Sequence, residues 1–244
     1  MRIVLFFLLV CQAQAQVNIE HYRGKLGLTG GANYSFNSDV GNVDVFNSGG
    51  GGNITINTES STILGVFKGG IGFQAGKRFA NNGVVHVRYT RKKHPVYQLE
   101  GFAQSDYAKS RNLDWRTLVG AGMRFNIIHR ETTAFSCGNA LMWEREGLDL
   151  SGLDPHPDLT SVLRSSSYIN LYFMSRITFS TTAYYQFSLK DPGDVRILGI
   201  AELTTPIIKS LHQTTSLNFR TDTDPPLGIK KTDVKLSTSF GFQL

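Results

Sequence analysis

The 244-residue sequence has no long hydrophobic run, few charged residues and only two cysteines. No apolar stretch approaches the ~20 residues that a membrane-spanning helix requires, which excludes a helical membrane protein. Charged residues make up 18% of the chain, against about 25% in ordinary soluble domains. Glycine (25 residues) and aromatic residues (11%) are abundant instead. This composition is typical of a β-rich protein, and also of a β-barrel whose outer face meets lipid.

The N-terminus has the three parts of a secretion signal. Arg2 supplies positive charge, residues 3–10 form an apolar run too short to cross a bilayer, and Ala13-Gln14-Ala15 has the small-x-small form of a signal peptidase site. We therefore predict cleavage after Ala15. Residues 1–15 are then the signal peptide, and residues 16–244 form one outer-membrane β-barrel domain.

Cysteine cannot stabilise the mature chain, because Cys137 is the only one left after cleavage. No internal disulfide framework is possible with a single cysteine. Cys11 lies in the signal behind Val10, whereas the residue before a lipidated cysteine is normally small, so lipidation is not expected. Cys137 has no nearby base in its predicted strand, and we interpret it as an inert packing residue.

Alternation of apolar and polar residues is the dominant pattern of the chain, and it predicts strands with one apolar and one polar face. In the last segment, apolar side chains dominate the even positions from Val234 to Leu244, and polar residues and glycine hold the odd ones. The predicted strands are 20–36, 43–57, 62–76, 83–91, 95–106, 113–128, 132–145, 160–174, 176–188, 193–206, 209–221 and 232–244.

The predicted connections alternate in length. Those at 146–159 and 222–231 are long, whereas those after the sixth, eighth and tenth segments have one to three residues. Long loops at one rim and tight turns at the other are typical of outer-membrane barrels. If the first strand starts in the periplasm, both long loops lie outside the cell. The predicted fold class is all-β, a single antiparallel up-and-down transmembrane β-barrel of about 12 strands.

In every predicted strand whose apolar and polar faces can be told apart, the charged residues near the middle of the strand lie on the polar face. We expect them to face the lumen, because an arginine at the lipid-facing midplane costs about 2–4 kcal/mol. A soluble β-sandwich or lipocalin-like barrel is the alternative, but with so few outward charges it would be poorly soluble. The predicted lumen-facing residues are Arg23, Lys25, Lys68, Arg88, Glu100, Arg116, Arg124, Arg164, Arg196, Glu202, Arg220 and Lys235.

The C-terminal third carries a family resemblance. The stretch Asn218–Asp233 reads N-F-R-T-D-T-D-P-P-L-G-I-K-K-T-D. It resembles the salt-induced outer membrane proteins of Gram-negative bacteria, a domain family of unknown function in which an aromatic strand with Arg runs into a Ser/Thr-Asp-Pro-Pro-x-Gly-Val/Ile-Lys-Lys-Thr-Asp loop. Arg116 with Gly120-Ala121-Gly122, and the strand from Asp194 to Pro206, fit the family's register. The resemblance implies a barrel in the outer membrane, in contact with its lipid and lipopolysaccharide and inserted by the barrel-assembly machinery.

Two extracellular loops are candidate binding sites. In the second, the carboxylates could take Ca²⁺ and the lysines could meet lipopolysaccharide phosphates. A solvated rigid turn is the favoured alternative, because Asp-Pro-Pro is stiff turn chemistry. The residues concerned in this loop are Asp222, Asp224, Lys230 and Lys231. The same interpretation applies to the first loop, with Asp149, Asp154, His156 and Asp158.

Catalysis finds little support in the sequence. His212 and Ser216 share one strand face and could suggest an outer-membrane lipase, but both are predicted to face inward and no third orienting residue is evident. No histidine belongs to a metal-binding pair, so neither a metal nor a cofactor is expected. Nucleic-acid binding is not expected despite a pI near 9.3, because the basic residues are scattered and the chain is exported.

Three hypotheses for function remain. The first is a small passive channel whose cationic lumen gives weak anion selectivity. The second is a structural or stress-adaptation barrel with a plugged lumen, in which arginines pair with Glu100, Glu202, Asp106 and Glu144 as struts. The third is a lipid-modifying enzyme, although the protein is expected not to be an enzyme. A monomer is expected in each case.

Overall fold

A computed structural model describes residues 17–19, 26–39, 45–150 and 152–243. The predicted signal peptide, Arg23 and Lys25 lie outside these residues. A short 3-10 helix, η2 (Lys109–Arg111), connects two strands. The twelve strands of the described residues are β1 (Gly27–Asp39), β2 (Val45–Asn57), β3 (Ser61–Gln74), β4 (Lys77–Arg91), β5 (Tyr97–Ala108), β6 (Leu113–His129), β7 (Thr133–Leu148), β8 (Leu159–Met174), β9 (Thr178–Ser188), β10 (Val195–Pro206), β11 (Leu211–Asp222) and β12 (Thr232–Gln243).

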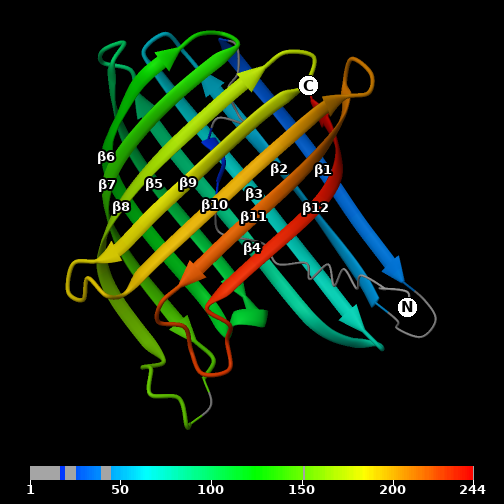
Figure 1. The fold of residues 1–244 in the computed structure, drawn as a ribbon, viewed down its shortest axis with the longest axis vertical. Helices are drawn as coiled ribbons and strands as arrows, with labels where there is room; N and C mark the ends of the chain where they lie inside the picture. The colour runs from blue at the N-terminus through cyan, green and yellow to red at the C-terminus, as the bar shows by residue number, and fades with distance from the viewer. Residues whose placement is uncertain (1–16, 20–25, 40–44, 151, 244) are drawn as a thin grey trace, which may run out of the picture.

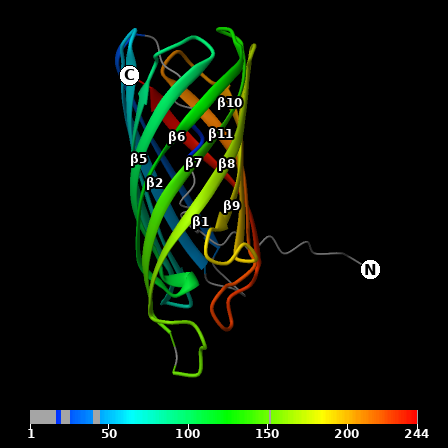
Figure 2. The same cartoon turned by 90° about the vertical axis from the view of Figure 1, so that its left-hand side faces the viewer.

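The strands close into a barrel. Each strand pairs antiparallel with its neighbours in sequence, and β1 pairs with β12 from Gly31↔Gln243 to Tyr34↔Phe240. The two views show the strands tilted and wrapped around one lumen (Figures 1 and 2). The predicted fold class, a single antiparallel barrel of about 12 strands, is confirmed.

Alternation along each strand divides an apolar outer face from a polar lumen. In β4, Val85 and Val87 are exposed, whereas His86 and Arg88 between them are each 4% exposed. Such alternation is what a strand needs when its two faces meet different surroundings. Closure gives the first and last strands a partner on each side, with β1 and β12 joined from Gly31↔Gln243 to Tyr34↔Phe240. Among the described residues, no helix is long and apolar enough to cross a membrane.

Most predicted strand bounds agree closely with the structure, and the start of β4 is the main error. We predicted a connection before residue 83, but β4 begins at Lys77. The physical reason is a two-residue turn, in which Ala75 (φ 48°) and Gly76 (φ 74°) both adopt positive φ angles. Turns of this kind match the twist of the flanking strands and extend the pairing, here to Gln74↔Lys77.

The two rims differ in the length of their connections. The rim that carries the start of β1 and the end of β12 has short turns and is called here the short-turn rim. The opposite rim, called the long-loop rim, carries residues 149–158 and 223–231 and also the tight turn at 75–76. Figure 1 shows these two loops at the end of the barrel away from the C-terminus.

Candidate functional site in the barrel lumen

The predicted lumen-facing charges lie at buried or half-buried positions wherever the structure describes them. Lys68 and Lys235 are half-buried. Arg124 donates from Nε to Asn126 Oδ1 at 3.0 Å. The buried members of the predicted set are Arg88, Glu100, Arg116, Arg124, Arg164, Arg196, Glu202 and Arg220. These side chains alternate with exposed apolar neighbours, so the polar phase of the strands is the buried one.

Glu144 on β7 is the centre of a buried ion-pair cluster. Its Oε1 accepts from Arg164 Nε at 3.0 Å and from Arg196 Nη1 at 2.8 Å. Its Oε2 lies 3.7 Å from Arg116 Nη1. The three arginines come from β8, β10 and β6, so one carboxylate joins four strands. We call the whole cluster the charged belt, and it consists of Asp106, Arg116, Glu144, Glu146, Arg164, Asp194, Arg196, Arg220 and Asp222.

Asp222 belongs to the charged belt and is the last residue of β11, one residue before the loop as the structure has it. It is 2% exposed. The register pairs it with Arg196 on β10, whose Nε lies 3.1 Å from Asp222 Oδ2. Arg220 Nη2 lies 2.6 Å from the same oxygen. Two guanidinium groups on the lumen face therefore hold this carboxylate inside the barrel.

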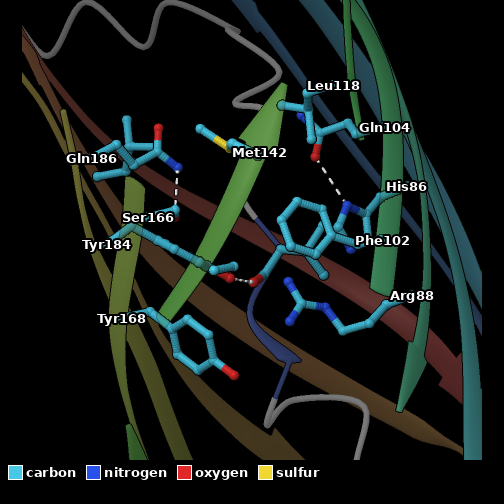
Figure 3. Close-up of a pocket in the computed structure, with 13 residues that line it drawn as sticks. His86, Arg88, Phe102, Gln104, Leu118, Met142, Ser166, Tyr168, Tyr184 and Gln186 are labelled. Atoms are coloured by element: carbon cyan, nitrogen blue, oxygen red, sulfur yellow. Dashed lines mark hydrogen bonds between the residues drawn. The ribbon is translucent and has the colours of Figure 1, made fainter. Parts of the chain in front are cut away.

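A second group of contacts lies inside the barrel and joins β4, β5 and β8. Arg88 on β4 binds Glu100 on β5, with Nη1 2.8 Å from Oε2, and the hydroxyl of Tyr168 on β8 donates to the same oxygen. The Arg88 guanidinium also lies 4.9 Å from the Phe102 ring centroid and 5.8 Å from that of Tyr168. Figure 3 shows Arg88 between these two rings.

Gly138 on β7 leaves room for the Tyr168 ring. The two residues are directly paired, and a Cβ at position 138 would lie 2.4 Å from the tyrosine ring. Tyr168 can therefore lie across the wall toward Glu100 only while position 138 is glycine. A cavity of about 40 Å³ adjoins the ring and is also lined by His86, which hydrogen-bonds Gln104.

Residues 17 and 18 lie inside the barrel and fill part of the lumen. Asn18 is 1% exposed; its Nδ2 donates to Ser180 Oγ at 2.9 Å and to Glu202 Oε2 at 2.7 Å. Thr182 Oγ1 donates to Asn18 Oδ1 at 3.1 Å. The Tyr184 hydroxyl donates to the backbone carbonyl of Val17, a contact drawn in Figure 3.

The two long loops are tied together at the long-loop rim. His156 lies between Asp154 of its own loop (Nδ1 to Oδ1, 2.6 Å) and Asp224 of the other (Nε2 to Oδ1, 3.1 Å). The Leu227 backbone N–H donates to Asp154 Oδ2 at 2.6 Å. The hydrogen bond to Asp154 raises the pKa of His156, although desolvation opposes the shift. Hydrogen bonds from the His156 backbone and side chain lower the pKa of Asp154.

The other predicted loop residues remain at the surface. Lys230 and Lys231 are exposed. Within the described residues, no group of three or more His, Cys, Asp or Glu side chains is arranged to hold a metal ion. Of the carboxylates considered for Ca²⁺, Asp154 and Asp224 bind His156, and Asp222 binds Arg196 and Arg220.

The residues considered for a lipase lie on β11. His212 and Ser216 are both half-buried, and the Ser216 hydroxyl donates to Glu202 Oε1 at 3.4 Å. Ser216 is thus joined to the hydrogen bonds around Asn18. Cys137 is a half-buried free cysteine on β7.

Sequence reasoning missed several residues that the structure brings into the lumen. Glu146 and Asp194 bind Arg196 and Arg164, respectively. The alternation of β7 carries a signal for Glu146, because it lies two residues from Glu144 and shares its face. Asn18 and Arg111 lie outside the regular strands, where alternation carries no signal.

Comparisons with known proteins agree with the barrel. The NanC porin is 10% identical with a TM-score of 0.52, covering 89% of this chain and 99% of that chain. The translocator domain of autotransporter NalP from Neisseria meningitidis is 10% identical with a TM-score of 0.50, covering 93% and 91%. At this identity the likeness concerns the fold alone. No curated protein matches the chain. Residues 19–244 match the family described as "Protein of unknown function, DUF481", and the chain belongs to that family.

Proposed function

We propose that this protein is an outer-membrane β-barrel whose lumen is closed at rest by its own side chains, and that it acts as a structural barrel rather than an open diffusion pore. The apolar outer face supports insertion into a bilayer, since large exposed hydrophobic surfaces on soluble proteins are rare. Examples on that face are Leu28 (73% exposed), Val119 (50%) and Leu163 (48%).

The proposed orientation follows from the rims. With the short-turn rim in the periplasm, the long loops at 149–158 and 223–231 lie outside the cell, which is the usual arrangement of outer-membrane barrels. Removal of residues 1–15 would leave Gln16 as the first residue, two positions before the buried Asn18.

The main support for a closed lumen is that ion pairs and hydrogen bonds join strands that are not neighbours. Arg196 on β10 reaches Glu144 and Glu146 on β7, across the interval filled by β8 and β9. Tyr168 on β8 reaches Glu100 on β5 in the same way. Each contact spans the two strands between its partners on the inner side of the barrel and so takes up space in the lumen. These contacts favour the plugged barrel predicted as one alternative from the sequence, in which arginines pair with carboxylates, over an open cationic pore.

An anion-selective channel is the second candidate, and the pairing of the arginines weakens it. A ring of Arg or Lys selects anions when its charge is available to the passing ion. Here Arg116, Arg164 and Arg196 each bind carboxylates. The resemblance to salt-induced outer membrane proteins would give a closed barrel a role in salt stress, which growth of a deletion strain at high salt would test.

Conductance across a planar bilayer tests closure directly. We expect the wild-type barrel to give no resolved current steps, and a variant that combines Glu144→Ala, Arg164→Ala and Arg196→Ala with Asn18→Ala, so that both fillings of the lumen are weakened, to conduct. The matched control is Glu131→Ala, Arg130→Ala and Arg176→Ala, which removes the same charges from exposed turns of the short-turn rim. Migration before and after boiling checks that each variant forms a closed barrel. Stable porin-sized steps from the wild type would contradict the proposal, and an anion-selective reversal potential would then favour the channel.

A further inference from the structure

A cavity of about 90 Å³ lies between the charged belt and the two long loops. Its floor includes Arg116 and Arg196, and its outer wall includes Pro225 and Ile229 of the 223–231 loop. A single water needs about 10–15 Å³ of such space, so the cavity has room for a small polar group and its solvent. Its position beneath the loops gives it a route to the exterior that does not pass through the belt.

Arg111 of η2 lines this cavity and forms no ion pair within the part of the chain that the structure describes. It is 6% exposed, and its Nε and Nη2 have no hydrogen-bond acceptor among the described residues. The four other arginines that line the cavity each form an ion pair; they are Arg116, Arg164, Arg196 and Arg220. The carboxylates of the cavity wall are already engaged, since Glu146, Asp194 and Asp222 bind these arginines and Asp224 binds His156.

An unpaired buried guanidinium is costly to the barrel. Removing a charge from water without giving it a partner is among the largest penalties in folding. Burial, together with the charges of Arg220 and Arg116, lowers the pKa of Arg111 to about 9. Burial and the two neighbouring guanidinium groups, only partly offset by the charges of Asp106 and Asp233, disfavour the positive charge at this position, and an anion in the cavity would relieve this penalty.

The geometry points to an oxyanion site anchored by Arg111. We propose that its free Nε–H and Nη2–H bind two oxygens of a carboxylate, phosphate or sulfate group, free in solution or carried on a small sugar acid. These two donors share one edge of the planar guanidinium, which matches the spacing of two oxygens on one anion. The hydroxyl of Thr160, which also lines the cavity and has no hydrogen-bond partner among the described residues, supplies a further donor.

The site goes beyond the proposed closed barrel and does not depend on conduction. The charged belt lies on its inner side, and the long loops cover its outer side. Binding would therefore occur at the long-loop rim while the lumen below stays closed. A conducting wild-type barrel would contradict the proposed function and leave this site untouched.

Thermal unfolding of the full-length mature barrel in detergent tests the site, with chloride held constant as background. The probes are inorganic phosphate and glucuronate, with glucose as the uncharged counterpart. A ligand that binds only the folded state raises the unfolding midpoint with its concentration. We expect a saturable rise of several degrees with an oxyanion and none with glucose. A response to phosphate alone indicates a free inorganic ion, and a response to glucuronate indicates a carboxylate carried on a sugar.

The substitution Arg111→Met gives a second, independent readout. Without any anion, this variant should unfold at a higher temperature than the wild type, because an unpaired buried charge has been removed, and it should not respond to oxyanions. Arg111→Lys keeps the charge but loses the paired donors, and should bind at least tenfold more weakly. The matched control Arg130→Met, at an exposed turn, should respond like the wild type. A wild-type barrel that responds to no oxyanion, or an Arg111→Met variant that still responds, would overturn the proposal.

Discussion

The lumen is filled in two different ways at two heights. Near the long-loop rim, the charged belt consists of arginines and carboxylates that all belong to the barrel wall or its connections, with Glu144 at its centre. Toward the short-turn rim, the wall offers short polar side chains such as Ser180 and Thr182, and the space between them is taken by residues 17 and 18. The first region fills itself, whereas the second needs a segment from outside the wall.

The two regions therefore depend on different parts of the chain. The charged belt forms as soon as strands β5 to β11 pair in register, because its members are fixed on those strands and, for Asp194, on the connection directly before β10. The region around Asn18 depends on where the chain begins, since cleavage after Ala15 would place Asn18 third in the mature protein. Electrostatics dominates in the first region, and neutral or charge-assisted hydrogen bonds in the second. Substitutions that act on only one of the two regions can test the distinction.

The largest effect is expected from Glu144→Gln. The substitution keeps the shape of the side chain but removes the charge that Arg116, Arg164 and Arg196 share. Breaking a buried ion pair from one side costs about 3–5 kcal/mol when the remaining charge has no other partner. The three arginines keep their bonds to Asp106, Asp194, Glu146 and Asp222, so we expect the free energy of unfolding, measured by urea titration in lipid or detergent, to fall by up to this amount. Glu131→Gln, at an exposed turn, is the matched control and should leave it unchanged.

A smaller loss in Glu144→Gln would also be informative. If the variant lost less than about 1 kcal/mol, the belt would be solvated like a surface ion pair, and the closed lumen would be wrong at this height. Residues 17 and 18 should stay in the lumen in this variant, because their hydrogen bonds to other described residues go to Ser180, Thr182, Tyr184 and Glu202, which lie outside the belt.

An intermediate effect is expected from Asn18→Ala. It removes hydrogen bonds to Ser180, Thr182 and Glu202, and leaves those buried groups without this partner, at a cost of about 1–3 kcal/mol. The segment should then leave the lumen more often. In a Cys137→Ser background, the rate at which a thiol reagent modifies Val17→Cys should rise about tenfold or more, since 1.4 kcal/mol corresponds to a factor of ten.

The control for Asn18→Ala is Thr181→Ala. Thr181 is the direct neighbour of Thr182 on β9, and alternation places it on the other face of the strand. This control should label at the wild-type rate. Equal labelling in both variants would show that residues 17 and 18 do not occupy the lumen through Asn18, and only the belt would then fill it.

Sequence alone predicted the wall of this barrel well. The predicted and observed bounds of β8, 160–174 against Leu159–Met174, differ by one residue, because alternation between Ile169 or Leu171 outside and Asn170 inside is uninterrupted. The beginning of β4 was missed because its first residues, from Lys77 on, alternate weakly and a turn of two residues was not recognised.

The site was predictable only in part. Alternation can place Arg196 and Glu144 in the polar phase, but it cannot pair them. Their contact depends on the stagger of β7 against β10, which accumulates over two intervening strands and is a property of the closed barrel. Asn18 and Arg111 were not predicted at all, since one precedes the first strand and the other lies in η2, where no period applies.

The smallest effect is expected at the contact between the two long loops, which covers the charged belt from outside. Because the pKa of His156 is raised, its contribution is fully present below its ordinary pKa of 6.5 and is lost as the pH rises through the raised value. Because the pKa of Asp154 is lowered, its contribution is present above its ordinary pKa of 3.8 and is lost as the pH falls through the lowered value. The contact should therefore be strongest between these two limits.

A distance measurement between the loops checks this window. Spin labels at Leu153→Cys and Leu227→Cys, both exposed sites, in a Cys137→Ser background should give a narrow distance distribution at mildly acidic pH. The distribution should broaden in alkali as His156 loses its proton and one loop is freed from Asp224. His156→Gln should be insensitive over this range, and His94→Gln, at an exposed turn of the short-turn rim, should behave like the wild type. Broadening on mild acidification instead would mean that His156 is not the group that joins the loops. The stability of the charged belt should not change over this pH range, since its ion pairs do not include this histidine.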